Sequence, residues 1–239
     1  EVLNTKVVIG RINMGLLNRI IIDDVLLDDQ SGQEMLKVTR LSAKFDIMPF
    51  FKGKISISSV QLFGFNINLR KETPDSPPNF KFVLDAFASK DTVKKENSLD
   101  LRINSILIRR GRMSYHVLSE EETPGKFNAK HIQLQNIIAN ISLKALSKDS
   151  LNLGIKRLSL DEKASGFSLK KMSLKLVANN KQTNIDNFTI ELPETSLKLD
   201  TIHLEYDSLK AFDRFTEQVH FSFRTLPSQV TLKDISPFV

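Results

Sequence analysis

The sequence predicts a mainly β protein whose strands are each bent once and are apolar on one side. Two observations predict this fold class. First, apolar and polar residues alternate through most of the 239 residues, as in Lys54-Ile55-Ser56-Ile57, which is the two-residue period of half-buried strands. Second, apolar residues recur within this alternation at positions i, i+2, i+5 and i+7, and the pair between i+2 and i+5 is usually polar.

This spacing recurs more often than chance allows. At an apolar fraction of 41%, chance supplies roughly two or three copies in the chain. The prediction rests on eight copies: Ile20, Ile22, Val25, Leu27; Leu36, Val38, Leu41, Ala43; Ile55, Ile57, Val60, Leu62; Leu101, Ile103, Ile106, Ile108; Phe127, Ala129, Ile132, Leu134; Leu153, Ile155, Leu158, Leu160; Phe167, Leu169, Met172, Leu174; and Leu197, Leu199, Ile202, Leu204. Partial copies lie at Ile185, Phe188, Ile190 and at Val230, Leu232, Ile235.

The spacing fits neither a helix nor a flat strand. On a helix, positions i and i+2 lie about 200° apart. On a flat strand, i+2 and i+5 would face opposite sides of the sheet. We therefore predict that each polar pair, such as Asp23-Asp24 or Ser58-Ser59, is a bulge or corner that returns the apolar side chains to one face.

Helices are expected in only two places. Pro77-Pro78 and Asn79 precede residues with helical spacing, which predicts a helix over residues 79–88. A second helix is predicted over residues 208–218. The charged stretch 90–97 contains no strand pattern, so it is the candidate boundary between an N-terminal region, residues 1–90, and a continuing bent-strand region, residues 91–239.

The sequence predicts no catalytic, cofactor or metal site. The chain has no cysteine and four histidines, and no His has a metal-ligand partner at helical spacing; His203 and His220 are expected to face solvent. The acidic run from Asp23 to Glu34 departs from a calcium loop and predicts a hairpin with solvent-facing carboxylates. The cluster Arg109-Arg110-Gly111-Arg112 predicts a solvated strand end, and no nucleic-acid partner is expected.

The order of segments in the first 90 residues resembles a known family. The resemblance is carried by Lys6-Val7-Val8-Ile9-Gly10, by the segment from Ile20 to Asp29, by the segment from Leu36 to Phe45, by the segment from Phe51 to Gly64, and by Pro78-Asn79-Phe80. This series is similar to the N-terminal region of AsmA-like proteins, and within them to the TamB branch, the inner-membrane-anchored subunits of translocation and assembly modules.

The resemblance implies a fold and a function. AsmA-like proteins stack bent strands into an elongated, curved antiparallel sheet, a half-open groove of the β-taco type with an apolar lining. It implies a non-enzymatic periplasmic segment that supports outer-membrane biogenesis by transporting phospholipid, by assembling outer-membrane proteins, or both. The candidate lining is Ile55, Ile57, Val60, Leu62, Leu101, Ile103, Ile106, Ile108, Leu197, Leu199, Ile202 and Leu204.

The resemblance also implies partners and a location. Phospholipid acyl chains are the expected cargo, and an outer-membrane barrel is the partner expected for a further C-terminal part. An apolar helix before residue 1 is expected to anchor the protein in the inner membrane, with this segment in the periplasm. The alternative is a β-rich scaffold or adhesion module with a closed core, because the bent-strand spacing alone does not distinguish an open lining from a closed one.

Overall fold

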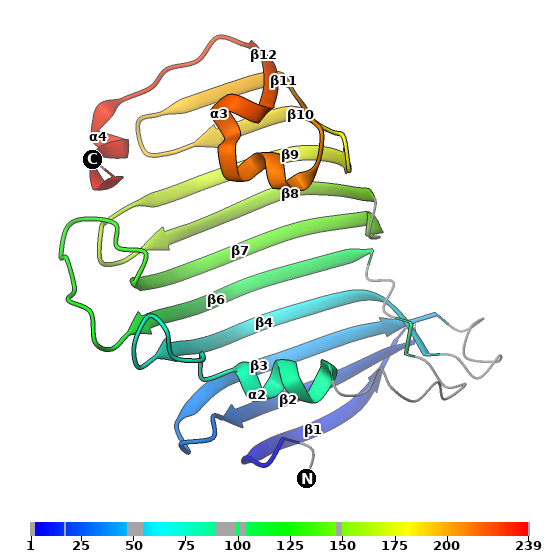
Figure 1. The fold of residues 1–239 in the computed structure, drawn as a ribbon. Helices are drawn as coiled ribbons and strands as arrows, with labels where there is room; N and C mark the ends of the chain where they lie inside the picture. The colour runs from blue at the N-terminus through cyan, green and yellow to red at the C-terminus, as the bar shows by residue number, and fades with distance from the viewer. Residues whose placement is uncertain are drawn as a thin grey trace.

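One mixed sheet makes up most of the protein, and it is not closed into a barrel (Figure 1). The computed structural model describes residues 3–16, 18–46, 55–88, 99–100, 104–146 and 150–238. Eleven strands of the described part follow one another across the sheet in the order β1-β2-β3-β4-β6-β7-β8-β9-β10-β11-β12, and the short β5 pairs with β4. The prediction of a mainly β protein is confirmed.

The strands are long and the helices short. The strands are β1 (Val7–Gly15), β2 (Arg19–Asp28), β3 (Glu34–Phe45), β4 (Ile55–Lys71), β5 (Leu99–Asp100), β6 (Ser105–Val117), β7 (His131–Leu146), β8 (Ser150–Glu162), β9 (Ser168–Asn179), β10 (Gln182–Glu191), β11 (Ser196–Tyr206) and β12 (Val219–Thr225). The helical segments are α2 (Lys81–Ala88), the 3-10 helix η2 (Leu209–Arg214), α3 (Phe215–Gln218), α4 (Leu232–Ile235) and the 3-10 helix η3 (Ser236–Phe238).

The expectation of a wholly antiparallel sheet is wrong at β4 and β6, which run parallel. Tight turns such as the one at residues 29–32 join antiparallel neighbours directly. A parallel neighbour instead needs a crossover of about a dozen residues or more, and the connection between β4 and β6, residues 72–104, contains α2. The two strands lie on either side of the predicted boundary at residue 90, and both belong to this sheet.

Left-handed residues mark several of the bends. Asp24 in β2 has a φ of 57°, which confirms the bend predicted at Asp23-Asp24. The same conformation occurs at Gly64 in β4, Arg110 in β6, Asn136 in β7 and Asn187 in β10, with φ between 53° and 63°. A single left-handed residue breaks the alternation of a strand and increases its local twist. The bends are therefore a property of the backbone at defined positions.

Register shifts mark other predicted bends. Ser58 is an extra residue in β4, because Lys44 pairs with Ser59 whereas Phe45 pairs with Ile57. Similar shifts place extra residues in β8 at the pair 156–157, in β9 at 170–171 and in β11 at residue 200.

The polar pair in β3 does return apolar side chains to one face. In β3, Leu36 and Val38 precede the polar pair and Leu41 follows it, yet all three contribute to the same hydrophobic cluster around Phe65 and Ile137. This is the arrangement that the i, i+2, i+5, i+7 spacing predicts.

Some expectations are wrong. Phe127 and Ala129 lie in the turn before β7, so the pair Lys130-His131 stands at the beginning of a strand. The partial copy that includes Leu232 and Ile235 forms helix α4 and is not a strand. The helix predicted over 79–88 is confirmed as α2, whereas the one over 208–218 is divided between η2 and α3.

The basic cluster lies in the middle of β6, which corrects its prediction as a strand end. Arg109, Arg110 and Arg112 are exposed, and the guanidinium of Arg110 lies 5.1 Å from the centre of the Phe63 ring. Gly111 is required here, since a Cβ atom would stand 2.4 Å from the Phe65 ring. The cluster is therefore a bend that lets a buried aromatic ring approach the backbone.

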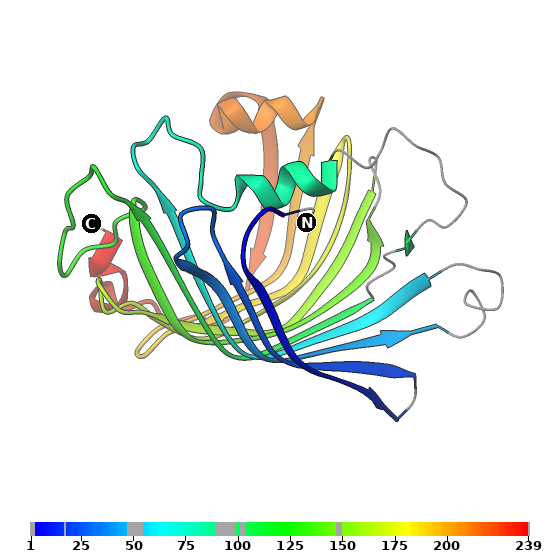
Figure 2. The ribbon, with the colours of Figure 1, turned by 90° about the horizontal axis from the view of Figure 1, so that it is seen from below.

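The sheet curves, and the helices cover only part of its concave side. Figure 2 shows α2 and the η2–α3 segment above the concave face. The accessible surface is 16092 Å², against about 11,000 Å² expected for a compact protein of this mass. A sheet with one face largely uncovered contributes to this excess. Among the described residues, no helix is long and apolar enough to span a membrane.

The acidic hairpin is present between β2 and β3, but three of its carboxylates are buried, contrary to the prediction. Asp29 is 2% exposed. Its carboxylate accepts hydrogen bonds from the backbone N–H groups of Ser31 and Gln33 (both 3.0 Å), from Arg70 (2.7 Å) and from Asn79 (3.2 Å). These bonds tie the hairpin to the end of β4 and to the segment that leads into α2.

The environment of Asp29 makes stability depend on pH. Burial by itself raises the pKa of Asp29. The hydrogen bonds from Ser31, Gln33 and Asn79 and the charge of Arg70 have the larger, opposite effect, so the pKa lies below its ordinary value near 3.8. A carboxyl group with a lowered folded-state pKa stabilises the fold above its unfolded pKa, and this stabilisation is lost as the pH falls through the folded pKa.

We predict that Asp29→Asn lowers the free energy of unfolding by about 2 kcal/mol at pH 7, the size expected for hydrogen bonds to a charged group. The difference from the parent should shrink as the pH falls below about 3.8. Urea unfolding at several pH values measures both effects. The exposed Glu34→Gln is the control. A deficit that stays constant down to pH 2.5 would contradict the assignment.

We also predict opposite effects of two substitutions at the exposed Asn187. Asn187→Gly should leave stability unchanged or raise it by up to about 1 kcal/mol, because glycine adopts the left-handed conformation without strain. Asn187→Val should lower it by about 1–2 kcal/mol. Thermal unfolding compares them, with Lys175→Val on the neighbouring strand as the control. Equal stability of the two variants would show that the bend does not need this backbone conformation.

Candidate functional site

Ten apolar residues form one continuous row across the sheet. Each is the direct register partner of the next, one from each strand from β1 to β11 except β5. The row, called the apolar row below, is Ile12, Ile22, Leu41, Leu62, Ile108, Ala139, Leu158, Met172, Ile190 and Leu197. Directly opposite residues in a sheet point to the same face. The row is therefore an unbroken apolar strip at right angles to the strands.

A second row runs beside the first. It consists of Met14, Ile20, Ala43, Val60, Ile106, Ile141, Ile155 and Leu174. The row between the two belongs to the other face and consists of Asn13, Ile21, Ser42, Gln61, Leu107, Asn140 and Arg157, of which five are polar. The sheet thus has one apolar face and one largely polar face.

The apolar face is the concave one. Leu204 of β11 packs against a cluster that contains Ala211 of η2, and η2 lies above the concave side (Figure 2). The extra residue at position 200 of β11 turns Leu204 to the face of Leu197, which is a member of the apolar row. Hence the bends turn the apolar face inward.

The structure places five of the twelve candidate lining residues in these two rows. Leu62, Ile108 and Leu197 belong to the apolar row, and Val60 and Ile106 to the second row. The side chains that the structure describes are all half-buried: Ile57, Val60, Leu62, Ile106, Ile108, Leu197, Leu199, Ile202 and Leu204. Leu101 and Ile103 lie outside the described residues, and for Ile55 only the backbone, in β4, is described.

Sequence reasoning missed part of this face at the first strand. In β1, Val7, Ile9, Ile12 and Met14 have the same i, i+2, i+5, i+7 spacing around Gly10-Arg11. All four are exposed, Met14 to 78%. The signal was present in the sequence, but its middle pair contains glycine where the other copies have a polar residue.

A second missed feature is a run of aromatic rings at the last strands. Neighbouring ring centres lie 4.8–6.3 Å apart from Tyr206 through Phe212, Phe215 and Phe221 to Phe223. Phe221 and Phe223 are 54% and 56% exposed and lie opposite Leu204 and Ile202. The concave face therefore ends at β12 in exposed aromatic side chains.

Fixed charges lie on the polar face. Asp23 is buried and accepts a 2.6 Å hydrogen bond from Nε of Arg40. This hydrogen bond lowers the pKa of Asp23 and raises that of Arg40. The pair is therefore ionised at neutral pH and holds adjacent strands together without placing charge on the apolar face.

The histidines divide into two kinds. His220 is exposed and His203 lies at a polar strand position beside Asn184 and Glu205. His116 and His131, by contrast, are directly paired across β6 and β7, with 3.0 Å between their Nδ1 atoms. A spacing of 15 residues carries no local signal, so only the strand register reveals this pair.

Comparison with protein-family models and with curated proteins finds no match to the chain.

Proposed function

We propose that the chain is a non-enzymatic segment of an AsmA-like protein of the TamB branch, whose curved sheet forms a half-open groove for phospholipid acyl chains. The observation that carries the proposal is the apolar row of ten register partners. The order of segments in the first 90 residues supports the family, and the bends support the groove.

The size of the row favours a conduit over a pocket for one ligand. Ten strands at about 4.8 Å spacing give a row roughly 43 Å long, whereas one leaflet of a bilayer is about 15 Å of hydrocarbon. Each methylene group removed from water is worth about 0.8 kcal/mol. An acyl chain can therefore move between successive strands while its contact with apolar side chains changes little.

The half-buried state of the lining argues against the alternative, a scaffold module with a closed core. In a closed β core, inward side chains are covered by a second layer. Here the nine described candidates are partly exposed, and the sheet does not close on itself. An outer-membrane protein segment is the second cargo that the resemblance implies, because extended apolar strands suit the same face.

The place proposed for the segment is the periplasm, with an inner-membrane anchor that precedes it and an outer-membrane barrel that pairs with a C-terminal part. The location, the anchor and the barrel partner all rest on the resemblance in the first 90 residues. No cofactor is needed for this function, because lipid transfer along an apolar surface breaks no covalent bond.

We predict that Ile190→Glu abolishes phospholipid binding while the fold persists. The new carboxylate on the apolar row can reach water in an open groove, but it places a charge against the acyl chains. Binding of a fluorescent phospholipid should weaken at least tenfold. Circular dichroism and the melting temperature test whether the variant is folded.

The matched control is Thr189→Glu, which adds the same charge to the same strand on the other face. It should bind phospholipid like the parent. A folded Ile190→Glu that also binds like the parent would remove the groove proposal, and unfolding of Ile190→Glu alone would favour the closed core. Binding of an unfolded outer-membrane protein in place of phospholipid would identify the second cargo.

A further inference from the structure

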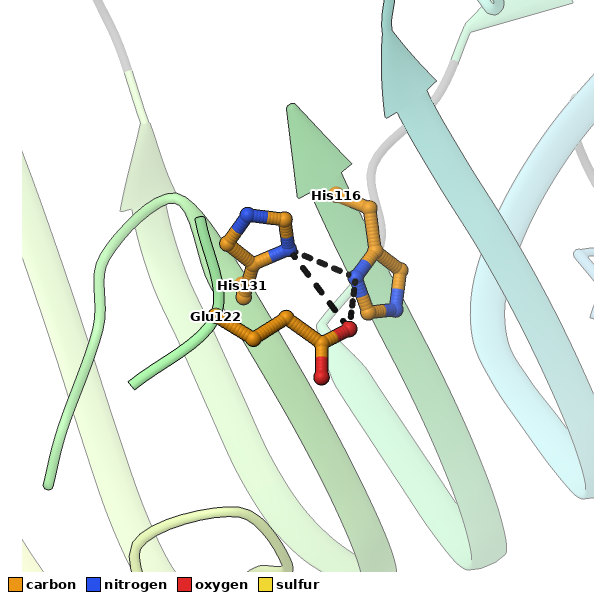
Figure 3. A group of neighbouring side chains, drawn as sticks. All are labelled: His116, Glu122 and His131. Carbon is orange, nitrogen blue, oxygen red and sulfur yellow. Dashed lines mark hydrogen bonds and ion pairs between the residues drawn. The ribbon is translucent and has the colours of Figure 1, made fainter. Parts of the chain in front are cut away.

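Three side chains converge at the ends of β6 and β7 (Figure 3). His116 and His131 face each other across the two strands, and Glu122 approaches both from the connecting loop. The Nδ1 atoms lie 3.0 Å apart, and each is 4.0 Å from Oε1 of Glu122. Three potential ligand atoms thus lie within 4.8 Å of one another.

The hydrogen bonds of His131 orient a lone pair toward this point. Its Nε2 is 2.8 Å from the backbone carbonyl oxygen of Glu120. A carbonyl only accepts, so Nε2 carries the proton and donates, and Nδ1 of the neutral ring keeps a lone pair. In the metal-free protein this lone pair accepts the 3.0 Å hydrogen bond from Nδ1–H of His116, and a metal ion replaces that proton when His116 carries its proton on Nε2 instead. Metal-bound histidines have this arrangement, in which the distal N–H is held by a carbonyl or carboxylate. The side chain of His131 is only 7% exposed, so its orientation is held by the surrounding structure.

We propose that His116, Glu122 and His131 bind one Zn²⁺ ion through their two Nδ1 atoms and one carboxylate oxygen. Two imidazole nitrogens with one carboxylate suit zinc, whereas Ca²⁺ and Mg²⁺ prefer oxygen ligands only. Tetrahedral zinc with bonds of about 2.1 Å places its ligands about 3.4 Å apart. The two nitrogen atoms are close to that separation, and the Glu122 side chain, 63% exposed, needs to move by less than about 1 Å.

The charges around the site leave room for a cation. Glu120 is paired with Lys130, so that pair is neutral. Lys163 lines the pocket of about 180 Å³ beside Glu122 and His131. Its positive charge would repel a bound metal ion and so lower the affinity of the site. With neutral histidines, Glu122 supplies the one negative charge among the ligands.

The ion would fasten a loop to the sheet. Residues 118–130 connect β6 to β7 without regular structure, and Glu122 is the only ligand that this loop contributes. A fourth position remains open for water, as in zinc sites with three protein ligands. His116 and His131 lie on the face opposite to Tyr115 and Ile132, so the site is separate from the apolar row and does not depend on its function.

The test is a titration of the metal-free chain with Zn²⁺. Binding is measured by calorimetry and by competition with a chromophoric zinc indicator. We expect one Zn²⁺ per chain with a dissociation constant in the micromolar range or below, and no comparable binding of Mg²⁺. Co²⁺ should give the visible absorption bands of a tetrahedral site. Absence of Zn²⁺ binding, or equal binding of Mg²⁺, would overturn the proposal.

Variants locate the site. His116→Gln and Glu122→Gln should each weaken Zn²⁺ binding at least tenfold, and neither side chain is buried, so both variants should fold. The controls His203→Gln and Glu121→Gln remove the same groups elsewhere and should bind as the parent does. Unchanged affinity in both His116→Gln and Glu122→Gln would overturn the proposal even if the parent binds zinc.

Discussion

The structure depends on a backbone constraint at the middle of its strands. A left-handed residue costs about 1–2 kcal/mol in most residue types, and Asp24, Asn136, Asn187 and Gly64 are of the types that reduce this cost. In return, the side chains on both sides of the bend reach the same face, where burial of each aliphatic side chain is worth about 1.5–3 kcal/mol. Packing therefore outweighs backbone strain, and the sheet curves.

Curvature without closure leaves a single-layered sheet with an amphipathic character. Fully buried side chains such as Val38, Phe65 and Ile137 gather where the bends bring neighbouring strands together. Elsewhere on the concave face, apolar side chains contact one another sideways and keep part of their surface exposed. The strands at the two edges, β1 and β12, carry the most exposed apolar residues, because each has only one strand neighbour in the described sheet.

Ionised carboxylates hold the ends of the strands. Asp29 fastens one rim of the sheet near α2, and Glu162 fastens the turn between β8 and β9, where it accepts hydrogen bonds from the backbone N–H groups of Gln133, Ala164 and Ser165. Burial raises the pKa of Glu162, but the hydrogen bond from the Ser165 hydroxyl and those from the three backbone N–H groups together lower it to below its ordinary value. The candidate zinc site belongs to the same class of feature, since it would tie a loop to a strand end through polar groups.

The mainly β class, several of the bends and the apolar identity of one face could be predicted from the sequence alone, because side-chain alternation and its interruption are local properties of a strand. The parallel pairing of β4 with β6, the burial of Asp29 and the contact of His116 with His131 could not. Each joins residues through the order and register of whole strands. That order is chosen by the summed packing of the sheet, so only the tertiary structure decides which distant polar groups meet.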